Sequence, residues 1–114
     1  MSVFDEEALI KLGRDLTNMR FALQFAQRYR TMLAQRVDRI LLALQEDDAV
    51  EAMDATLSLK VASTTVGTVE LADLALLIEV DVRSRELARA RELAARLPDA
   101  AARADRALAD YLVA

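Results

Sequence analysis

Apolar residues recur at intervals of three and four positions along most of the chain, which is the period of an α-helix. The sequence offers little turn material, because it contains only two Gly and one Pro. We therefore expect four long helices over approximately residues 18–46, 48–65, 69–82 and 85–112. A shorter helix is expected over residues 5–12, where acidic residues in the first turn suit the helix dipole and Gly13 can end the helix.

Short connectors between successive helices favour an antiparallel, up-down four-helix bundle, with the short amino-terminal helix lying against it. The fold class is therefore expected to be all-α. With 114 residues, the chain is expected to form a single domain over residues 1–114, since this length can bury one core but is too short for two.

Pro98 interrupts the last predicted helix, because it lacks a backbone N–H and crowds the carbonyl four residues earlier. The apolar phase continues unchanged across this position, from Ala94 to Leu97 and Ala101. We therefore expect a kink or a brief break along one packing line, and not a change of direction.

Phe21, Phe25 and Tyr29 form an aromatic row near the start of the helix predicted over residues 18–46. The apolar positions of this helix recur at three and four, and they include Phe25 and Tyr29. We interpret the row as core or helix-packing material and not as a ligand site.

The segment from Asp48 to Gly67 is apolar on two opposite sides. With about 100° of rotation per residue, one stripe carries small and branched residues suited to a central helix: Ala52, Ala55, Leu59, Ala62 and Val66. The opposite stripe carries Val50, Met53, Leu57, Val61 and Thr64, flanked by Asp54 and Lys60. Because Leu57 and Leu59 lie about 200° apart, either this helix is buried on all sides or Leu57 marks a surface that contacts a partner.

The formal net charge of −4 argues against a general nucleic-acid-binding protein, which needs clustered Lys and Arg to displace counterions from phosphate. No window approaches the ~18 uncharged apolar residues of a membrane span, and the acidic amino terminus does not look like a signal peptide. The chain has no Cys, which is consistent with a reducing compartment. We therefore expect a cytoplasmic protein that binds neither nucleic acid nor membrane.

The sequence contains no His, and this absence removes the commonest general base and transition-metal ligand. Because Cys and a Gly-rich phosphate loop are also missing, we expect neither an enzyme nor a cofactor. Acidic residues cluster from Glu46 to Asp54, but they lack the glycine and the regular oxygen spacing of a calcium loop. We interpret the cluster as a helix start, with Asp47 or Asp48 as cap and Glu51 in a capping box, and we expect no metal site.

Leu59, Lys60 and Gly67 occur at a spacing that resembles the histidine phosphotransfer (HPt) domains of bacterial phosphorelays. That family carries a His on a bundle helix, followed by Leu at the second position after it, Lys at the third, Gly at the fourth and a further Gly at the tenth. Leu57 occupies the His position here, and Val61 occupies the position of the first Gly.

The resemblance covers the chain from about Phe21 to Leu112 in helix order and length, and it implies a role in two-component signalling. In the family, the His exchanges a phosphoryl group with an aspartyl phosphate of a receiver domain, the Lys helps to hold the anionic group, and the first Gly leaves room for the partner. Since Leu57 has no nucleophile, the resemblance implies a degenerate member that binds a receiver or a histidine kinase without carrying phosphate. Glu79 stands where some members place a polar residue that bonds the His; it is equally well an ordinary exposed helix residue.

Two functional classes remain open. In the first, the chain is a pseudo-phosphotransfer domain whose docking surface is formed by Val50, Met53, Asp54, Leu57, Lys60, Val61 and Thr64. In the second, it is a helical interaction or dimerisation module unrelated to phosphotransfer, and its apolar Leu57 face forms a homodimer seam. Between Ile40 and Val82 the chain has nine acidic residues and one base, Lys60. Because receiver active sites are acidic, this excess of acidic residues opposes receiver docking. Self-association or binding of a non-receiver partner is therefore kept as an expectation alongside receiver docking.

Overall fold

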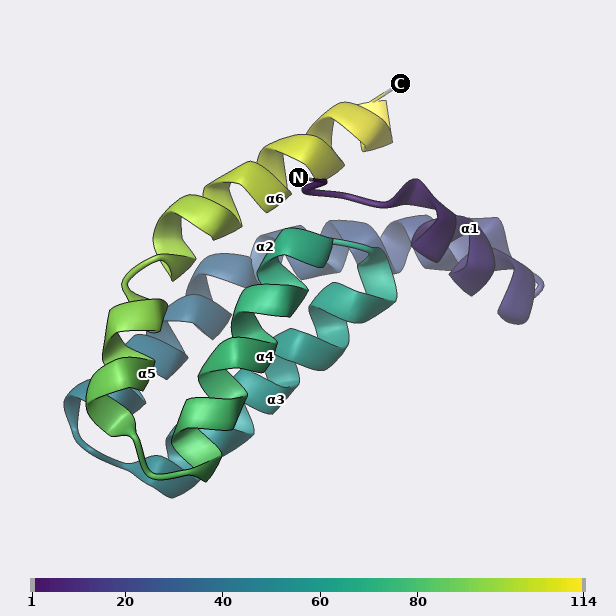
Figure 1. The fold of residues 1–114 in the computed structure, drawn as a ribbon. Helices are drawn as coiled ribbons and strands as arrows, with labels where there is room; N and C mark the ends of the chain where they lie inside the picture. The colour runs from purple at the N-terminus through teal and green to yellow at the C-terminus, as the bar shows by residue number, and fades with distance from the viewer. Residues whose placement is uncertain (1, 114) are drawn as a thin grey trace.

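The three-four pattern of the sequence folds into six α-helices in the computed structural model, which describes residues 2–113 (Figure 1). They are α1 (Glu6–Asp15), α2 (Met19–Gln45), α3 (Ala49–Val66), α4 (Val69–Arg83), α5 (Leu87–Ala94) and α6 (Leu97–Val113). The all-α class is therefore confirmed, and residues 2–113 contain no β-strand. Among the helices of these residues, none combines the length and the apolar content that a membrane crossing requires.

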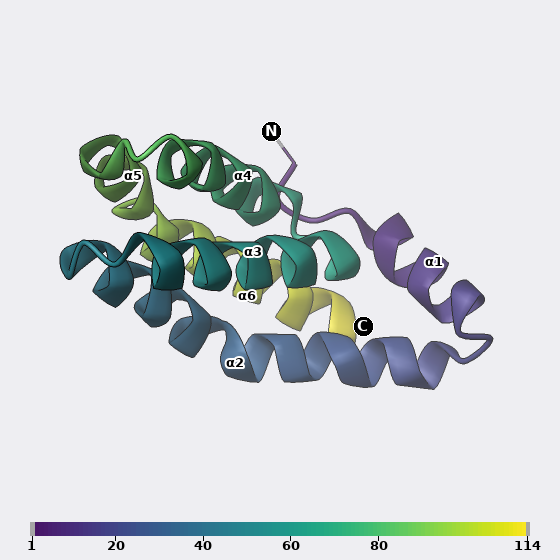
Figure 2. The same ribbon diagram turned by 90° about the horizontal axis from the view of Figure 1, so that it is seen from below.

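Helix α3 lies between α2 and α4 and contacts both, as Figure 2 shows. The two pairs α2–α3 and α3–α4 each run antiparallel, because short turns join them. Helices α5 and α6 complete the arrangement, since both contact α2 and α4. The α3 stripe that was expected to face the core is buried between these neighbours: Ala52, Ala55, Leu59, Ala62 and Val66.

The single helix predicted over residues 85–112 is wrong, because the chain breaks between α5 and α6. Pro98 occupies the second position of α6, where a backbone N–H would have no intrahelical partner. The Arg96 N–H donates to the Leu93 carbonyl (3.0 Å), so α5 ends in a tight turn. The brief break is therefore confirmed, whereas the expectation of an unchanged direction is wrong, since α6 runs in a different direction from α5 in both views (Figures 1 and 2). The same apolar stripe nevertheless stays buried across the break: Ala90, Ala94, Leu97, Ala101, Ala104 and Leu108.

Gly13 does not end the first helix, which continues to Asp15. Gly13 is buried where α1 meets the start of α2, and a Cβ atom added to it would lie 2.6 Å from Met19 Cε. Helix α2 then begins at the expected cap, because the Asn18 side chain accepts a hydrogen bond from the Phe21 N–H (3.2 Å). Gly13 thus permits a close contact between two helices instead of stopping one.

Gly67 ends α3 in a left-handed backbone conformation, with a φ of 93°. Its carbonyl accepts a hydrogen bond of 2.8 Å from the Asp5 N–H, so the start of α1 lies against the turn between α3 and α4. A Cβ atom at this position would lie 2.2 Å from the Asp5 carbonyl oxygen. Both the backbone conformation and the close contact therefore require Gly.

A buried hydroxyl cluster holds the same turn against α2. The Tyr29 hydroxyl lies 2.8 Å from Ser63 Oγ and 2.8 Å from Thr68 Oγ1. Thr68 occupies the cap position of α4, but its side chain makes no capping bond and serves this cluster instead. Burial raises the pKa of Tyr29, which keeps the phenol neutral in the core.

Replacing Gly67 with Ala is expected to lower the free energy of unfolding by about 2 kcal/mol or more, because positive φ is costly for an L-residue. Gly13→Ala is the matched control. A Cβ at Gly13 mainly meets the end of the flexible, exposed Met19 side chain, and the better helix propensity of Ala offsets part of that clash. Urea-induced unfolding of both variants measures the difference, and equal losses would show that the Gly67 turn is not constrained as described.

Candidate functional site

The structure places all seven predicted docking residues on α3, and α3 is not buried on all sides. Val50 and Val61 are 78% and 60% exposed, and Asp54 and Thr64 are exposed as well. Met53, Leu57 and Lys60 are partly buried. The second apolar stripe of α3 is therefore a surface, with Leu57 at its middle. We call this stripe the α3 surface.

Leu57 forms a ridge between two shallow grooves. The groove between α2 and α3 has a volume of about 400 Å³, and its lining includes Phe25, Arg36 and Val61. The groove on the other side, between α3 and α4, has a volume of about 380 Å³, and it is lined by Ala49, Val50, Met53, Asp54, Leu57, Val82, Arg83 and Arg85. Leu57 is therefore accessible from two sides.

Two aromatic residues of α2 are exposed, and one of them, Phe25, extends the apolar area beyond α3, because it lines a groove with Leu57 and Val61. Phe21 and Phe25 are 60% and 43% exposed, so their interpretation as helix-packing residues is wrong, whereas Tyr29 is buried as expected. The core phase of α2 follows Ala22, Ala26 and Tyr29, and each Phe precedes an Ala of this stripe by one position. This shift of about 100° turns the two rings away from the core. In the sequence, the four-residue spacing of Ala22 and Ala26 is the signal that places the core on the alanine stripe and leaves the two Phe rings outside it.

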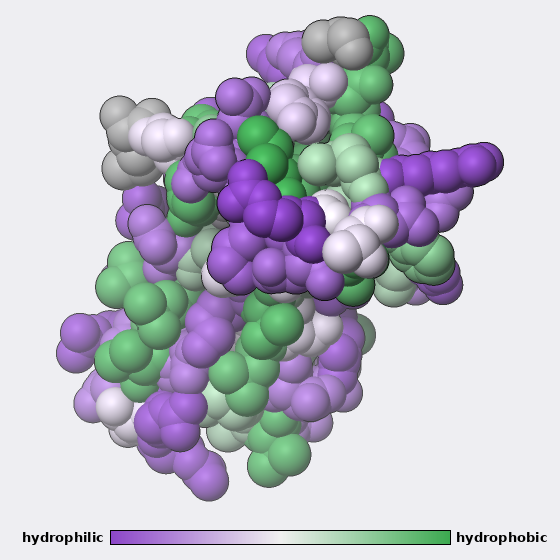
Figure 3. Space-filling model, turned by 90° about the vertical axis from the view of Figure 1, so that its right-hand side faces the viewer, coloured by the Kyte–Doolittle hydropathy of each residue, from purple (hydrophilic) through white to green (hydrophobic). Residues whose placement is uncertain are grey.

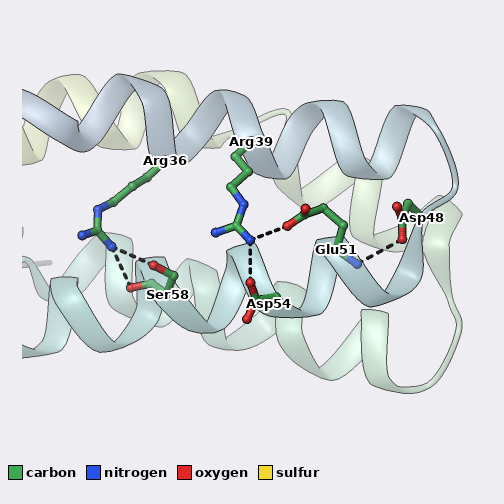
Figure 4. Close-up of polar contacts among 6 residues, drawn as sticks. All are labelled: Arg36, Arg39, Asp48, Glu51, Asp54 and Ser58. Carbon is green, nitrogen blue, oxygen red and sulfur yellow. Dashed lines mark hydrogen bonds and ion pairs between the residues drawn. The ribbon is translucent and has the colours of Figure 1, made fainter.

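Sequence reasoning also missed two arginines that α2 brings to α3, shown in Figure 4. Arg36 Nη1 donates to Ser58 Oγ (2.8 Å) and to the Ser58 carbonyl (3.2 Å). Arg39 forms ion pairs with Glu51 and Asp54, and these carboxylates raise its pKa. The count of acidic residues along α3 therefore overstates the negative charge of the surface.

The acidic start of α3 is a capped helix end with arginine partners. The Asp48 side chain accepts a hydrogen bond from the Glu51 N–H (3.0 Å), which confirms Asp48 as the cap. The prediction of a capping box is wrong, because the Glu51 carboxylate pairs with Arg39 and does not accept a hydrogen bond from the Asp48 N–H. Arg91 of α5 pairs with Asp47 at 2.6 Å. In residues 2–113, no three carboxylates lie close enough together to hold a metal ion.

Glu79 is a buried member of an ion cluster and not an exposed helix residue, since it is only 7% exposed. Lys60 Nζ lies 2.6 Å from Glu79 Oε1, and Arg83 Nη2 lies 2.6 Å from Glu79 Oε2. These two hydrogen bonds, the one from Lys60 first, lower the pKa of the Glu79 carboxyl below its ordinary value. The cluster orients Lys60 along the boundary between α3 and α4.

Neither Leu57 nor its neighbour Ser58 is placed to act as a nucleophile in group transfer. Leu57 has no nucleophilic atom, and the neighbouring Ser58 hydroxyl is held by Arg36, a donor that cannot take its proton. The Val61 side chain also projects where the resemblance implies a Gly. Comparison of the chain with protein-family models, curated proteins and solved structures gives no match.

Glu79 is expected to contribute to the loss of stability in acid. Because its pKa is lowered by folding, its contribution is complete above the ordinary value of 4.5 and is lost as the pH falls through the folded-state pKa. Glu79→Gln should therefore lose less unfolding free energy than the wild type between about pH 6 and about pH 3. Glu92→Gln, at an exposed position of α5, is the control, and identical pH profiles for the wild type and Glu79→Gln would contradict the role of the cluster.

Proposed function

We propose that this chain is an HPt-like protein of a two-component phosphorelay, acting as a pseudo-phosphotransfer domain that binds a receiver domain or a histidine kinase. The observation that carries the proposal is the position of Leu57. It stands at the His position of the resemblance, halfway along α3, on a ridge between two grooves. A partner that approaches the ridge contacts α2, α3 and α4 at once.

The order of the helices supports the finer description of the fold as an HPt-like, antiparallel up-down four-helix bundle. In this description α2, α3 and α4 are three members, and α5 with α6 is the fourth, which contacts both α2 and α4. Helix α1 is then the short amino-terminal helix, which contacts α2 and α3. The break before Pro98 divides the fourth member without exposing its apolar stripe.

The charges around Leu57 favour an acidic partner more than the sequence alone indicated. Arg36 lies in the lining of one groove, and Arg83 and Arg85 line the other. Asp54 shares Arg39 with Glu51, so the negative charge of these two carboxylates is partly compensated from within the chain. The basic groups therefore surround the apolar ridge, which is the arrangement that an acidic receiver active site would meet favourably.

The proposed role requires neither catalysis nor a cofactor, and it places the protein in the cytoplasm, where receiver domains and kinases act. The partner is a protein, and no nucleic acid or membrane takes part. A strip that combines Val50, Val61 and the exposed Phe25 ring is an apolar area of the kind that marks contacts between proteins.

The same apolar strip also supports a second candidate, a helical dimerisation module unrelated to phosphotransfer. The favouring observation is the high exposure of Val50 and Val61 at the two ends of the α3 surface. In this case a second copy would cover the ridge. Sedimentation of Leu57→Asp separates the two candidates, because this variant should abolish a dimer that forms through the α3 surface.

Leu57→Asp is expected to weaken binding to a receiver or kinase at least about tenfold, because it puts a carboxylate in the middle of the contact. The melting temperature should fall only slightly, since Leu57 is partly exposed. Leu42→Asp is the matched control, at an exposed leucine of α2 outside the α3 surface. Calorimetric titration against each receiver domain of the same genome measures the change, and an unchanged affinity would remove Leu57 from the interface.

No phosphoryl group is expected on this chain after incubation with phosphorylated receivers, because Leu57 has no acceptor atom. Leu57→His combined with Val61→Gly should create weak acceptance if a receiver docks on the α3 surface. Radiolabel transfer measures both, with Leu42→His as the control that stays unlabelled. Label on the wild type would contradict the proposal, and an inactive double variant would favour the dimerisation module.

A further inference from the structure

The outer side of α4 carries a second apolar strip, separate from the α3 surface. Leu76, Leu77 and Val80 are each about half exposed, at 47%, 51% and 53%. Leu76 and Val80 lie opposite the buried Ile78 on the helix circumference, and Leu77 lies about 100° from it. The ion pair of Lys60 with Glu79 crosses the boundary between α3 and α4, so charged side chains separate this strip from the α3 surface. Figure 3 shows apolar areas divided by hydrophilic bands on the side of the molecule that carries α1.

The charges at the two ends of the α4 strip are opposite in sign. Asp73 is exposed and lies one turn before Leu76, and Arg83 is exposed and lies one turn after Val80. The order along the helix is therefore acid, apolar and base. An antiparallel copy of the same helix presents the complementary order.

We propose that a second copy of this chain binds the α4 strip, with the two α4 helices antiparallel about a two-fold axis that crosses the strip at the level of Ile78 along the helix. Positions equidistant from the axis face each other in such a pair. Leu76 then contacts the partner's Val80, and Asp73 pairs with the partner's Arg83. Because the axis repeats each contact, the interface contains two ion pairs around a central apolar cluster.

The size of the strip makes this dimer weak. Helix α4 has 15 residues and is roughly 22 Å long. An interface along one helix stays below the ~1,200 Å² of total buried area that stable complexes usually exceed. The protein is therefore a monomer when dilute and a dimer when concentrated, and the α3 surface remains free in both states.

Sedimentation equilibrium over a concentration series tests this dimer with a charge exchange. Asp73→Arg alone places Arg against Arg, and Arg83→Glu alone places Asp against Glu, so each variant should dimerise at least about tenfold more weakly than the wild type. An equimolar mixture of the two variants restores opposite charges at both contacts. The mixture should therefore recover the mass and the concentration dependence of the wild type.

The controls are Glu92→Arg and Arg85→Glu, which change exposed charges outside the strip and should leave the dimer unchanged. Leu57→Asp should also leave it unchanged, which separates this dimer from one formed through the α3 surface. Arg83→Glu also removes a partner of Glu79, so its melting temperature is measured first. If that variant does not fold, Val80→Asp replaces it and should abolish the dimer. A wild type that stays monomeric, single variants that dimerise normally, or a mixture of folded variants that fails to recover would each overturn the proposal.

Discussion

The close packing of α3 between α2 and α4 is the constraint on which the rest of the structure depends. The side of α3 that faces its neighbours carries small residues, among them Ala52, Ala55 and Ala62, and these let the three helices approach each other. Leu59 and Val66 on the same side fill the space between the alanines. Val50 and Val61 lie on the opposite side of the helix, where they form part of the α3 surface.

The same packing decides the electrostatics of the surface. Because α2 lies beside α3, its arginines reach the acidic first turns of α3, where Arg39 pairs with both Glu51 and Asp54. On the other side, Glu79 of α4 is buried against Lys60 and Arg83. The charge that a partner meets is set by these contacts between helices. A sum of charges over one stretch of sequence does not describe it.

The sequence predicted the all-α class and the buried stripes because helical periodicity is a local property that each segment carries alone. The stripe of α3 from Ala52 to Val66 illustrates this. Glu79 shows where such reasoning ends, since its burial depends on Lys60, which lies nineteen positions earlier on another helix. The two Phe rings of α2 were misassigned for a related reason: a one-position shift from the core phase decides exposure, and an aromatic side chain looks apolar in either place. The break before Pro98 was predictable, but the new direction of α6 depends on the helices that it contacts.

The three positions that match the HPt pattern all have a role in this fold. Leu59 is fully buried, Lys60 pairs with Glu79, and Gly67 provides the left-handed turn against Asp5. Each would therefore be required by the bundle even without any chemistry. Leu57 and Val61, which depart from the pattern, instead lie on the α3 surface, where they add apolar contact area. Because each match also stabilises the fold, Leu57 and Val61 are the positions that bear most directly on what this chain contacts.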